Sequence, residues 1–491
     1  MVIKPLAAGV LSMLLAACTV GPDYVRPTTP TPATYLHAGT ETSAHADSDP
    51  AFWKQFNDPL LTQLVDDALA NNRDLVAALA RYRQANALLR GARWNQAPTL
   101  QADAGYQDRR SSAAGLPMFD RDLRDQDVYQ GEVGFSWELD LFGRLRRATE
   151  AARADTQARA SDLAALQVSI VGELGSRYFQ LRGLQEQLRI ARANAENQAR
   201  TANLLEVRQR EGFATAFDVD RSRAQLESTR SRIPALESQA AQVAHGIAVL
   251  AGKRPDEFWA SLSADAAWPQ LPERIATDAP AELLRRRPDV AAAERRLASA
   301  TAQVGVATAD LFPRISLSAL FGTQALASGD LFKRDSETRT LGVGVGGGFL
   351  NVGRVRAQIA ATNAGAAESL ALYDQSVLRA LQDAEGALAR WRGSRGELTH
   401  LQEAAEASAR ASDIARLRFD EGAIDTLELL EAENARLLAE SALAQGRAGQ
   451  GQAVVGLYRA MAGGWLDQPP GEKVVEIVPE QTDGSARTVM R

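Results

Sequence analysis

Residues 129–139 read YQGEVGFSWEL, and a stretch with a different period, residues 144–210, follows almost at once. In the first stretch apolar and polar residues alternate, which predicts a β-strand with one apolar and one polar face. In the second, apolar residues recur at steps of three and four, which predicts an α-helix. Roughly 67 residues of helix would be about 100 Å long at 1.5 Å per residue. No globular domain needs such a helix, so this pair of elements decides the fold.

Three more segments alternate with a period of two: residues 100–107, 315–322 and 341–346. With residues 129–139 they give four strands of roughly nine to eleven residues, the length that crosses a membrane in a β-barrel. The alternative is two amphipathic hairpins packed on the helices of a soluble protein. The pattern G-x-G-x-x-G at residues 342–347 lies inside one of these strands, so it does not indicate a dinucleotide site.

Four strands cannot close a barrel, and lipid does not tolerate an unpaired sheet edge. Two copies would supply about eight strands, whose interior is filled by side chains, whereas three copies would supply about twelve and leave a lumen. We therefore expect a homotrimer with a shared 12-stranded barrel and with its long helices gathered as a cylinder. Acidic residues on the polar strand faces are then expected to line the lumen and to favour cations over anions: Asp103, Glu132 and Glu138.

The two halves of the chain resemble each other. Asp74 aligns with Asp289 at one offset, and Gly212 aligns with Gly422 at a slightly shorter one. Such a duplication predicts two similar structural units related by pseudo-symmetry. We assign the repeats to residues 52–252 and 281–465, with a proline-containing linker or equatorial segment at residues 253–280. Within the first repeat, further helices are expected over residues 52–97 and 217–250.

The N-terminus has the features of a secretory signal. Residues 1–17 contain Lys4 and about a dozen apolar residues, too few to span a bilayer. The only cysteine, Cys18, ends a stretch that resembles a bacterial lipobox, although an ordinary signal peptide is the alternative. We expect Cys18 to carry a lipid anchor, and the following threonine favours sorting to the outer membrane. Residues 18–51 are expected to form a tether and residues 466–491 a C-terminal tail.

Composition and motifs give little support to other classes of protein. The net charge of −6 over 491 residues provides no polybasic surface for nucleic acid. The four histidines show no metal-ligand spacing, and we expect neither an enzyme nor a cofactor other than the lipid. The run Arg285–Asp289 could suggest an anion site. Because Pro288 and Asp289 suit the first turn of a helix, a solvated helix start is the preferred interpretation.

Two glycines, Gly212 and Gly422, interrupt the helical stretches, and each follows a glutamate and precedes small or polar residues. The pattern suits a tight helix-to-helix turn, and both turns should lie at the same distal tip. Just before the second turn, Asp413, Arg416 and Asp420 share one helix face by their spacing. On spacing alone, a solvated face of ion pairs explains these three residues better than a gate does.

Five segments, in order along the chain, resemble the TolC-like outer membrane factor family, in particular its OprM/NodT-type lipoproteins. In the last of them Ala462 stands where a glycine is usual. The segments are residues 18–27, 136–144, 284–290, 312–317 and 457–465.

This resemblance implies a trimer with a β-barrel in the outer membrane of a Gram-negative bacterium, an α-helical tunnel through the periplasm and an equatorial region. It implies a passive exit duct for drugs, toxic small molecules or metal ions, working with a periplasmic adaptor and an inner-membrane transporter, usually of the resistance-nodulation-division (RND) type.

The resemblance also assigns roles to residues. Asp413 resembles an aperture aspartate of the family, so Asp413, Arg416 and Asp420 become candidates for a periplasmic gate. The turns at Gly212 and at Gly422 and Ala423 become candidates for adaptor docking. Two alternatives stay open: a duct for type I protein secretion, and a non-conducting scaffold lipoprotein of the envelope.

Overall fold

The computed structural model describes residues 19–37, 42–43, 51–112, 114, 125–264, 267–272, 274–277, 279–347 and 351–461. The predicted signal segment, Cys18 and the predicted tail lie outside these residues. The chain divides into two compact units, each built from parts of both repeats. The first contains residues 1–28, 81–159 and 292–374, and the second contains residues 29–80, 160–291 and 375–491.

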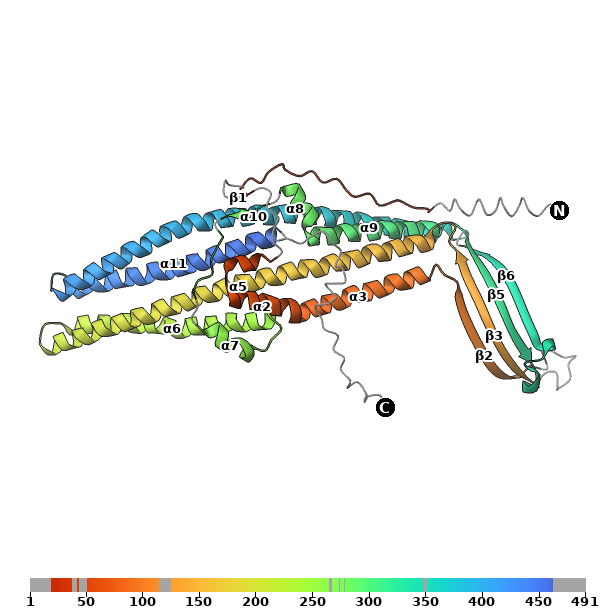
Figure 1. Ribbon diagram of the computed structural model, residues 1–491, viewed down its shortest axis with the longest axis horizontal. Helices are drawn as coiled ribbons and strands as arrows, with labels where there is room; N and C mark the ends of the chain where they lie inside the picture. The colour runs from red at the N-terminus through yellow and green to blue at the C-terminus, as the bar shows by residue number, and fades with distance from the viewer. Residues whose placement is uncertain are drawn as a thin grey trace. The chain divides into compact units, whose positions relative to one another are not determined.

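The first unit holds an antiparallel sheet in the order β2-β3-β5-β6 (Figure 1). Its strands are β2 (Thr99–Arg110), β3 (Asp125–Leu139), β5 (Arg314–Ala325) and β6 (Glu337–Gly346). The four predicted strands are therefore confirmed. The central pair, β3 and β5, joins one repeat to the other.

The strand register confirms the two-faced character of the sheet. Leu100 lies opposite Phe135, Phe135 opposite Ala319, and Ala319 opposite Leu341, so one apolar row crosses all four strands. The neighbouring row runs through Gln101, Gly134, Leu320 and Thr340, which is more polar. Strands β2 and β6 form the two edges of this sheet. Unpaired backbone groups at such edges have no water partner in lipid and require further strands.

Two very long helices dominate the chain. Helix α5 (Arg144–Arg210) has 67 residues, as the sequence predicts, and α10 (Val352–Asp420) has 69. Each turns into a helix of 35 residues, α6 (Ala216–Leu250) and α11 (Thr426–Ala460). A helix of 22 residues precedes each strand pair, α3 (Arg73–Trp94) and α9 (Pro288–Ala309). The order helix, two strands, long helix, helix thus occurs twice.

The helical stretch expected over residues 52–97 is divided into separate elements. The structure has three elements there: the short 3-10 helix η1 (Phe52–Phe56) and the α-helices α2 (Pro59–Asn71) and α3. Asp58 begins α2 by accepting a hydrogen bond from the Leu61 N–H, and Pro59 occupies the first helical position. Asn72 separates α2 from α3, because its side chain accepts hydrogen bonds from the backbone N–H groups of Asp74 and Leu75.

The segment predicted as a linker contains regular structure. It holds α7 (Pro255–Ser263) and β4 (Ile275–Ala276), and β4 pairs in parallel with β1 (Thr42–Ser43) from the predicted tether. Helix α8 (Pro280–Arg286) follows directly. Two short 3-10 helices, η2 (Ser328–Asp330) and η3 (Arg334–Ser336), lie between β5 and β6. Within the described ranges no helix is both long enough and apolar enough to cross a bilayer.

Candidate functional site

Two helix-to-helix turns of the second unit have the same backbone design. Gly212 and Gly422 have φ of 82° and 75°, the left-handed region that favours glycine. The N–H of the next residue reaches back five positions, from Phe213 to Arg208 O and from Ala423 to Arg418 O, at 2.8 Å in both cases. This is the Schellman arrangement that ends helices. An added Cβ would meet nothing within 4 Å at either glycine, so backbone conformation alone requires glycine there.

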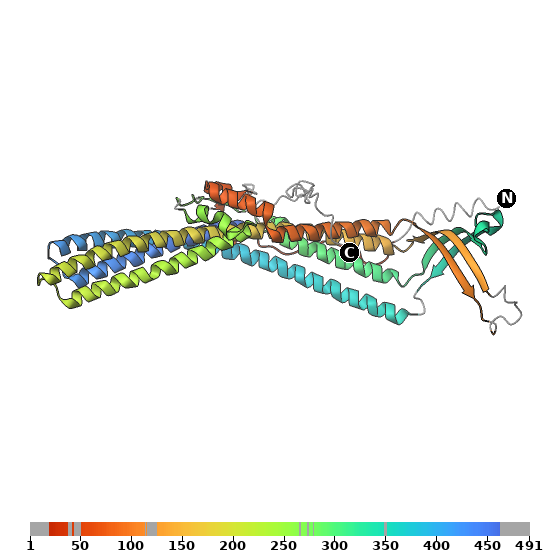
Figure 2. The same ribbon diagram turned by 90° about the horizontal axis from the view of Figure 1, so that it is seen from below.

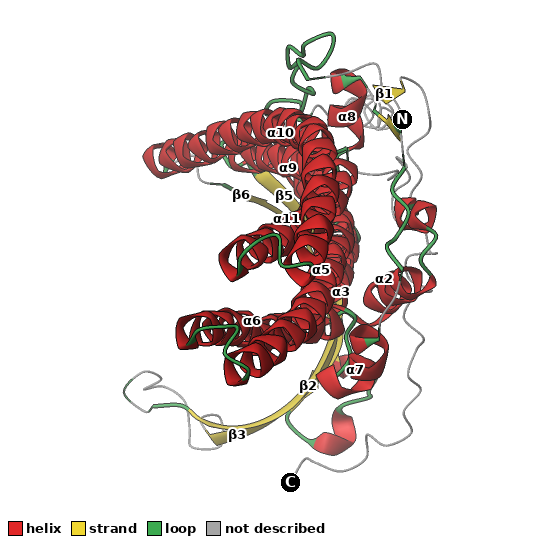
Figure 3. Cartoon of the chain, turned by 90° about the vertical axis from the view of Figure 1, so that its left-hand side faces the viewer, coloured by secondary structure: helices red, strands yellow, loops and turns green. Residues whose placement is uncertain are grey.

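The following helices start on polar caps. Thr215 and Asp218 form a capping box at the start of α6, and Asp425 accepts from the Glu428 N–H at the start of α11. Hydrogen bonds from the hydroxyl and the backbone N–H of Thr215 hold the pKa of Asp218 below its usual range. The turns lie at the same end of the second unit, as Figures 1 and 2 show, and both face the viewer in Figure 3.

Ion pairs join α10 to α11 behind the second turn. Arg436 donates from Nη1 to Asp413 Oδ1 and from Nε to Glu440 Oε1, both at 2.8 Å. These carboxylates, Glu440 foremost, raise the pKa of Arg436. Arg416 donates to Glu433, which is 5% exposed, and to Thr201 Oγ1 of α5 at 3.2 Å. Two of the three predicted gate residues therefore make inter-helix contacts within one protomer.

The third predicted gate residue differs. Asp420 is exposed and forms no ion pair with the described part of the chain. Sequence reasoning missed the partners Arg436 and Glu433. The spacing of the charged residues was the signal that could have found them. Arg416 lies three residues nearer the turn than Asp413 on α10, and Glu433 lies three residues nearer the turn than Arg436 on α11. Both pairs thus obey one antiparallel helix register.

The three predicted lumen residues are not equivalent. Asp103 and Glu132 lie directly opposite each other on β2 and β3, and the only side-chain hydrogen bond Asp103 shows in the described structure comes from Gln101 at 3.2 Å. Opposed like charges are unfavourable, so a cation between the two carboxylates would be stabilising. Glu138 instead accepts from Arg144 Nε at 2.9 Å and from Nη2 at 2.7 Å, which neutralises its charge.

Aromatic residues occupy two levels of the sheet. Tyr106 and Tyr129, in the half of β2 and β3 away from the helices, contact each other at 5.0 Å between ring centroids. At the helical end, Trp137 donates to Gln96 O, and Phe142 stacks on Phe312 at 4.7 Å. The strand distance from Tyr129 to Trp137 is roughly 27 Å at 3.4 Å per residue. At the strand tilt typical of membrane barrels this length corresponds to a height of about 20 Å, compared with an apolar band of about 25 Å in such barrels.

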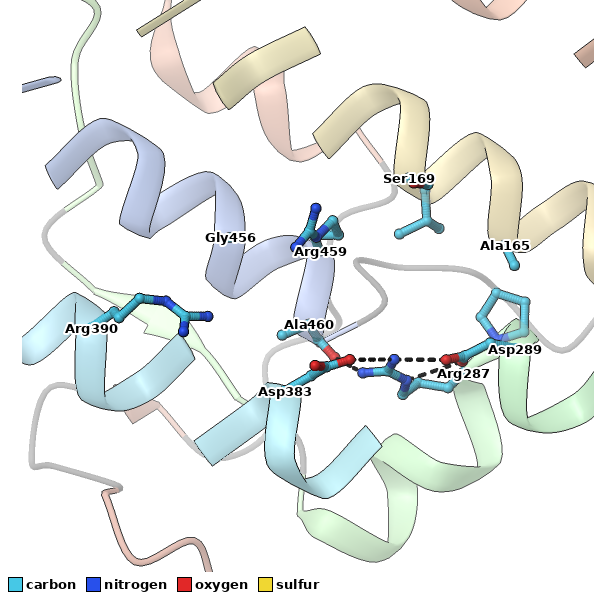
Figure 4. Close-up of a pocket in the computed structure, with 11 residues that line it drawn as sticks. Ala165, Ser169, Arg287, Asp289, Asp383, Arg390, Gly456, Arg459 and Ala460 are labelled. Carbon is cyan, nitrogen blue, oxygen red and sulfur yellow. Dashed lines mark hydrogen bonds and ion pairs between the residues drawn. The ribbon is translucent and has the colours of Figure 1, made fainter. Parts of the chain in front are cut away.

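The run at Arg285–Asp289 is a helix junction. Arg287 donates to Asp289 at 3.0 and 2.7 Å, to Asp383 at 3.0 Å and to Ala460 O, the end of α11, at 3.0 Å (Figure 4). Burial disfavours its charge, but the two carboxylates keep the pKa of Arg287 above its usual value. The expected helix start is present, but Arg287 is buried rather than solvated. A cavity of about 240 Å³ adjoins it.

The residues that follow Cys18 pack against other parts of the first unit. Val20 N–H donates to Phe142 O at 3.2 Å, and a Cβ added at Gly21 would lie 2.4 Å from Gly305 Cα. Buried Arg147 donates to Asp23 at 2.6 Å and to the carbonyls of Val20 and Gly21. We call residues 19–26 the N-terminal strap. It is held where the sheet meets the start of α5.

Comparison with known proteins identifies the family. The family described as "Outer membrane efflux protein" matches residues 64–253 and 279–463. The pyoverdine export outer membrane protein OpmQ of Pseudomonas putida is 34% identical over 470 residues, which cover 94% of this chain and 97% of OpmQ. The outer membrane protein OprJ of Pseudomonas aeruginosa is 30% identical over 460 residues, covering 94% and 95%.

Solved structures agree with this assignment. The structure of the outer-membrane channel OprN matches 91% of this chain and 100% of its own, with a TM-score of 0.84 and 38% identity. The proteins of this family are the outer-membrane components of tripartite efflux pumps: TolC-like trimers that work with an adaptor and an inner-membrane transporter. They are transport proteins rather than enzymes. The predicted family, fold and location are confirmed: the chain belongs to the outer membrane efflux protein family and is an efflux channel of the Gram-negative outer membrane.

Proposed function

We propose that this channel is a passive exit duct of an RND-type pump, and that the α10–α11 hairpin forms its periplasmic gate. The observation that carries the proposal is the pair of ion pairs in one helix register, Asp413–Arg436 and Arg416–Glu433, just behind the turn. Around a threefold axis, exposed Asp413 and Asp420 carboxylates of three copies would repel one another unless cations or arginines stand between them. Adaptor binding would shift the population of gate states toward open.

The turns are the proposed docking points for the adaptor. Gly212, Gly422 and Ala423 are exposed, and their backbone conformations are fixed by the Schellman bonds and the caps that follow. A preformed tip lowers the ordering cost of binding. The first turn also presents Phe213, which is 84% exposed, and such aromatic side chains are frequent anchors of protein interfaces.

Two further features complete the proposal. Cys18 carries the lipid anchor, and no other cofactor takes part; the strap would fix that anchor beside the sheet–helix junction. The cargo is small molecules, as supported by a relative that is named for pyoverdine export. Selection of the cargo would belong to the pump, while Asp103 and Glu132 would favour passage of cations.

Crosslinking at the tip tests the assignment to an efflux pump. With Cys18 consumed by lipid, Ala423→Cys would be the only free thiol, and a photocrosslinker attached to it reports what docks there. Trp94→Cys, on an exposed position of α3 in the other unit, is the matched control. We expect capture of an adaptor encoded with an RND transporter from Ala423→Cys alone. Capture of a secretion-type adaptor would move the channel to protein export. No adaptor capture during active efflux would contradict docking at the tip.

A further inference from the structure

One apolar cluster holds the tips of both hairpins together. It contains a buried residue from each of the four helices: Leu205 of α5, Val219 of α6, Phe419 of α10 and Leu429 of α11. Ala214 and Ile424, from the two turns, pack against it. The α10–α11 hairpin therefore cannot leave the α5–α6 hairpin without exposing these side chains.

Phe419 is the largest member of the cluster and makes a second contact across the hairpins. The guanidinium of Arg208 on α5 lies 4.7 Å from the centre of its ring. A cation over an aromatic face is attracted by the ring quadrupole. Phe419 also lies between Arg418 and Asp420, so movement of this end of α10 displaces the aromatic ring and the exposed carboxylate together.

The layer behind this cluster is polar. Gln198 is 1% exposed, and neither atom of its amide group has a partner among the described residues. Glu433 Oε2 likewise has no hydrogen-bond partner among the described residues, while the other carboxylate oxygen of Glu433 accepts from Arg416. Gln198 lies one helical turn from Thr201, which accepts a hydrogen bond from Arg416 of the second hairpin. Buried polar atoms without partners destabilise the packing that buries them.

We propose that Phe419 latches the α10–α11 hairpin onto the α5–α6 hairpin, and that opening withdraws Phe419 while water enters between Gln198 and Glu433. The inference rests on the proposed gate, because it names the packing that acts together with the ion pairs. Closure is favoured by the apolar cluster and opposed by the polar layer. This balance leaves the two states close enough in free energy for an adaptor to shift them.

The two parts of the latch predict opposite effects. Phe419→Ala removes the ring from the apolar cluster and its contact with Arg208, so the population of the open state should increase. Gln198→Leu replaces the unsatisfied amide by an apolar group of similar size, so the population of the closed state should increase. Leu226→Ala is the matched control, because Leu226 packs with Ala195 and Ala202 of α5 inside one hairpin.

Single-channel recording in planar bilayers distinguishes these outcomes. We expect Phe419→Ala to raise the mean conductance several-fold, Gln198→Leu to lower it, and Leu226→Ala to leave it unchanged, each as an assembled trimer. Should Phe419→Ala not assemble, Arg208→Gln is the second variant, with a smaller increase expected. The latch would be overturned if conductance stays unchanged in Phe419→Ala, or in Arg208→Gln used in its place, while Asp413→Ala raises it. The proposed ion-pair gate would then still be supported. Unchanged conductance in all of them would reject both.

Discussion

Asp413 and Arg436 pair across the α10–α11 hairpin at 2.8 Å in the same helix register that brings Arg416 to Glu433 one turn nearer the tip. Each pair joins the two helices within one protomer. The proposed gate charges are therefore tied to both helices of the hairpin, and Arg416 also contacts Thr201 of α5.

The helix junctions offer a stability test. We expect Arg287→Met to lower the free energy of unfolding by about 2 kcal/mol. This lies below the usual cost for a buried pair because Asp289 and Asp383 keep contact with solvent. Asn72→Ala, at the other junction, should cost about 1 kcal/mol, typical of a lost cap. Thermal unfolding of the two variants measures this ranking. Equal losses would show that Arg287 adds nothing beyond capping.

The turn glycines can be tested by paired substitutions. Gly422→Ala should destabilise the hairpin by about 1 kcal/mol because alanine is strained at this φ, whereas Gly422→Asn should cost less. Gly449→Ala, inside α11 with nothing within 4 Å of an added Cβ, should be neutral or stabilising. Melting temperatures of the three variants provide the comparison. A neutral Gly422→Ala would argue against the left-handed turn.

The N-terminal strap should detach when its close approach is blocked. Gly21→Ala places a Cβ 2.4 Å from the backbone of Gly305, at a φ of 89° that alanine avoids. Hydrogen–deuterium exchange of residues 19–26 should become faster in this variant. Gly91→Ala, on α3 with open space around it, should leave the exchange unchanged. Equal protection of the strap in Gly21→Ala and the original chain would mean that the backbone contact does not hold it.

The opposed carboxylates on β2 and β3 predict cation preference. In a salt gradient the channel should show a cation-selective zero-current potential, and Asp103→Asn with Glu132→Gln should move it toward zero. Asp108→Asn is the matched control, because residue 108 points to the opposite face of the same strand. Anion selectivity of the original channel, or an unmoved potential in the double variant, would remove these residues from the selectivity mechanism.

The sequence predicts the elements of this fold better than it predicts their partners. Helix α5 with its ends, and the existence of the four strands, follow from periodicity, because each pattern extends over many residues. The break at Asn72 was missed, since one side chain that caps the next helix outweighs the continuing apolar pattern. Arg436 and Glu433 were missed because pairing across a hairpin depends on the register set by the turn. Glu138 was assigned to the lumen without its partner Arg144 for a similar reason.

The repeat adds information that neither half contains alone. Asn72 and Arg287 occupy equivalent positions by the offset that aligns Asp74 with Asp289, and both stand where one helix ends and another begins. Asn72 donates to Leu250 O at the end of α6, and Arg287 donates to Ala460 O at the end of α11. The two halves thus keep the same junction with different side chains, which an aligned duplication could have indicated.

The gate is tested most directly by the single-channel conductance of trimers that carry Asp413→Ala together with Arg416→Ala. Glu186→Ala with Arg189→Ala, which removes an exposed ion pair within α5, is the matched control. Loss of both inter-helix pairs should raise the conductance several-fold over that of the original channel and the control. Conductance that stays at the original level in properly assembled trimers would contradict the claim that these ion pairs hold the duct closed.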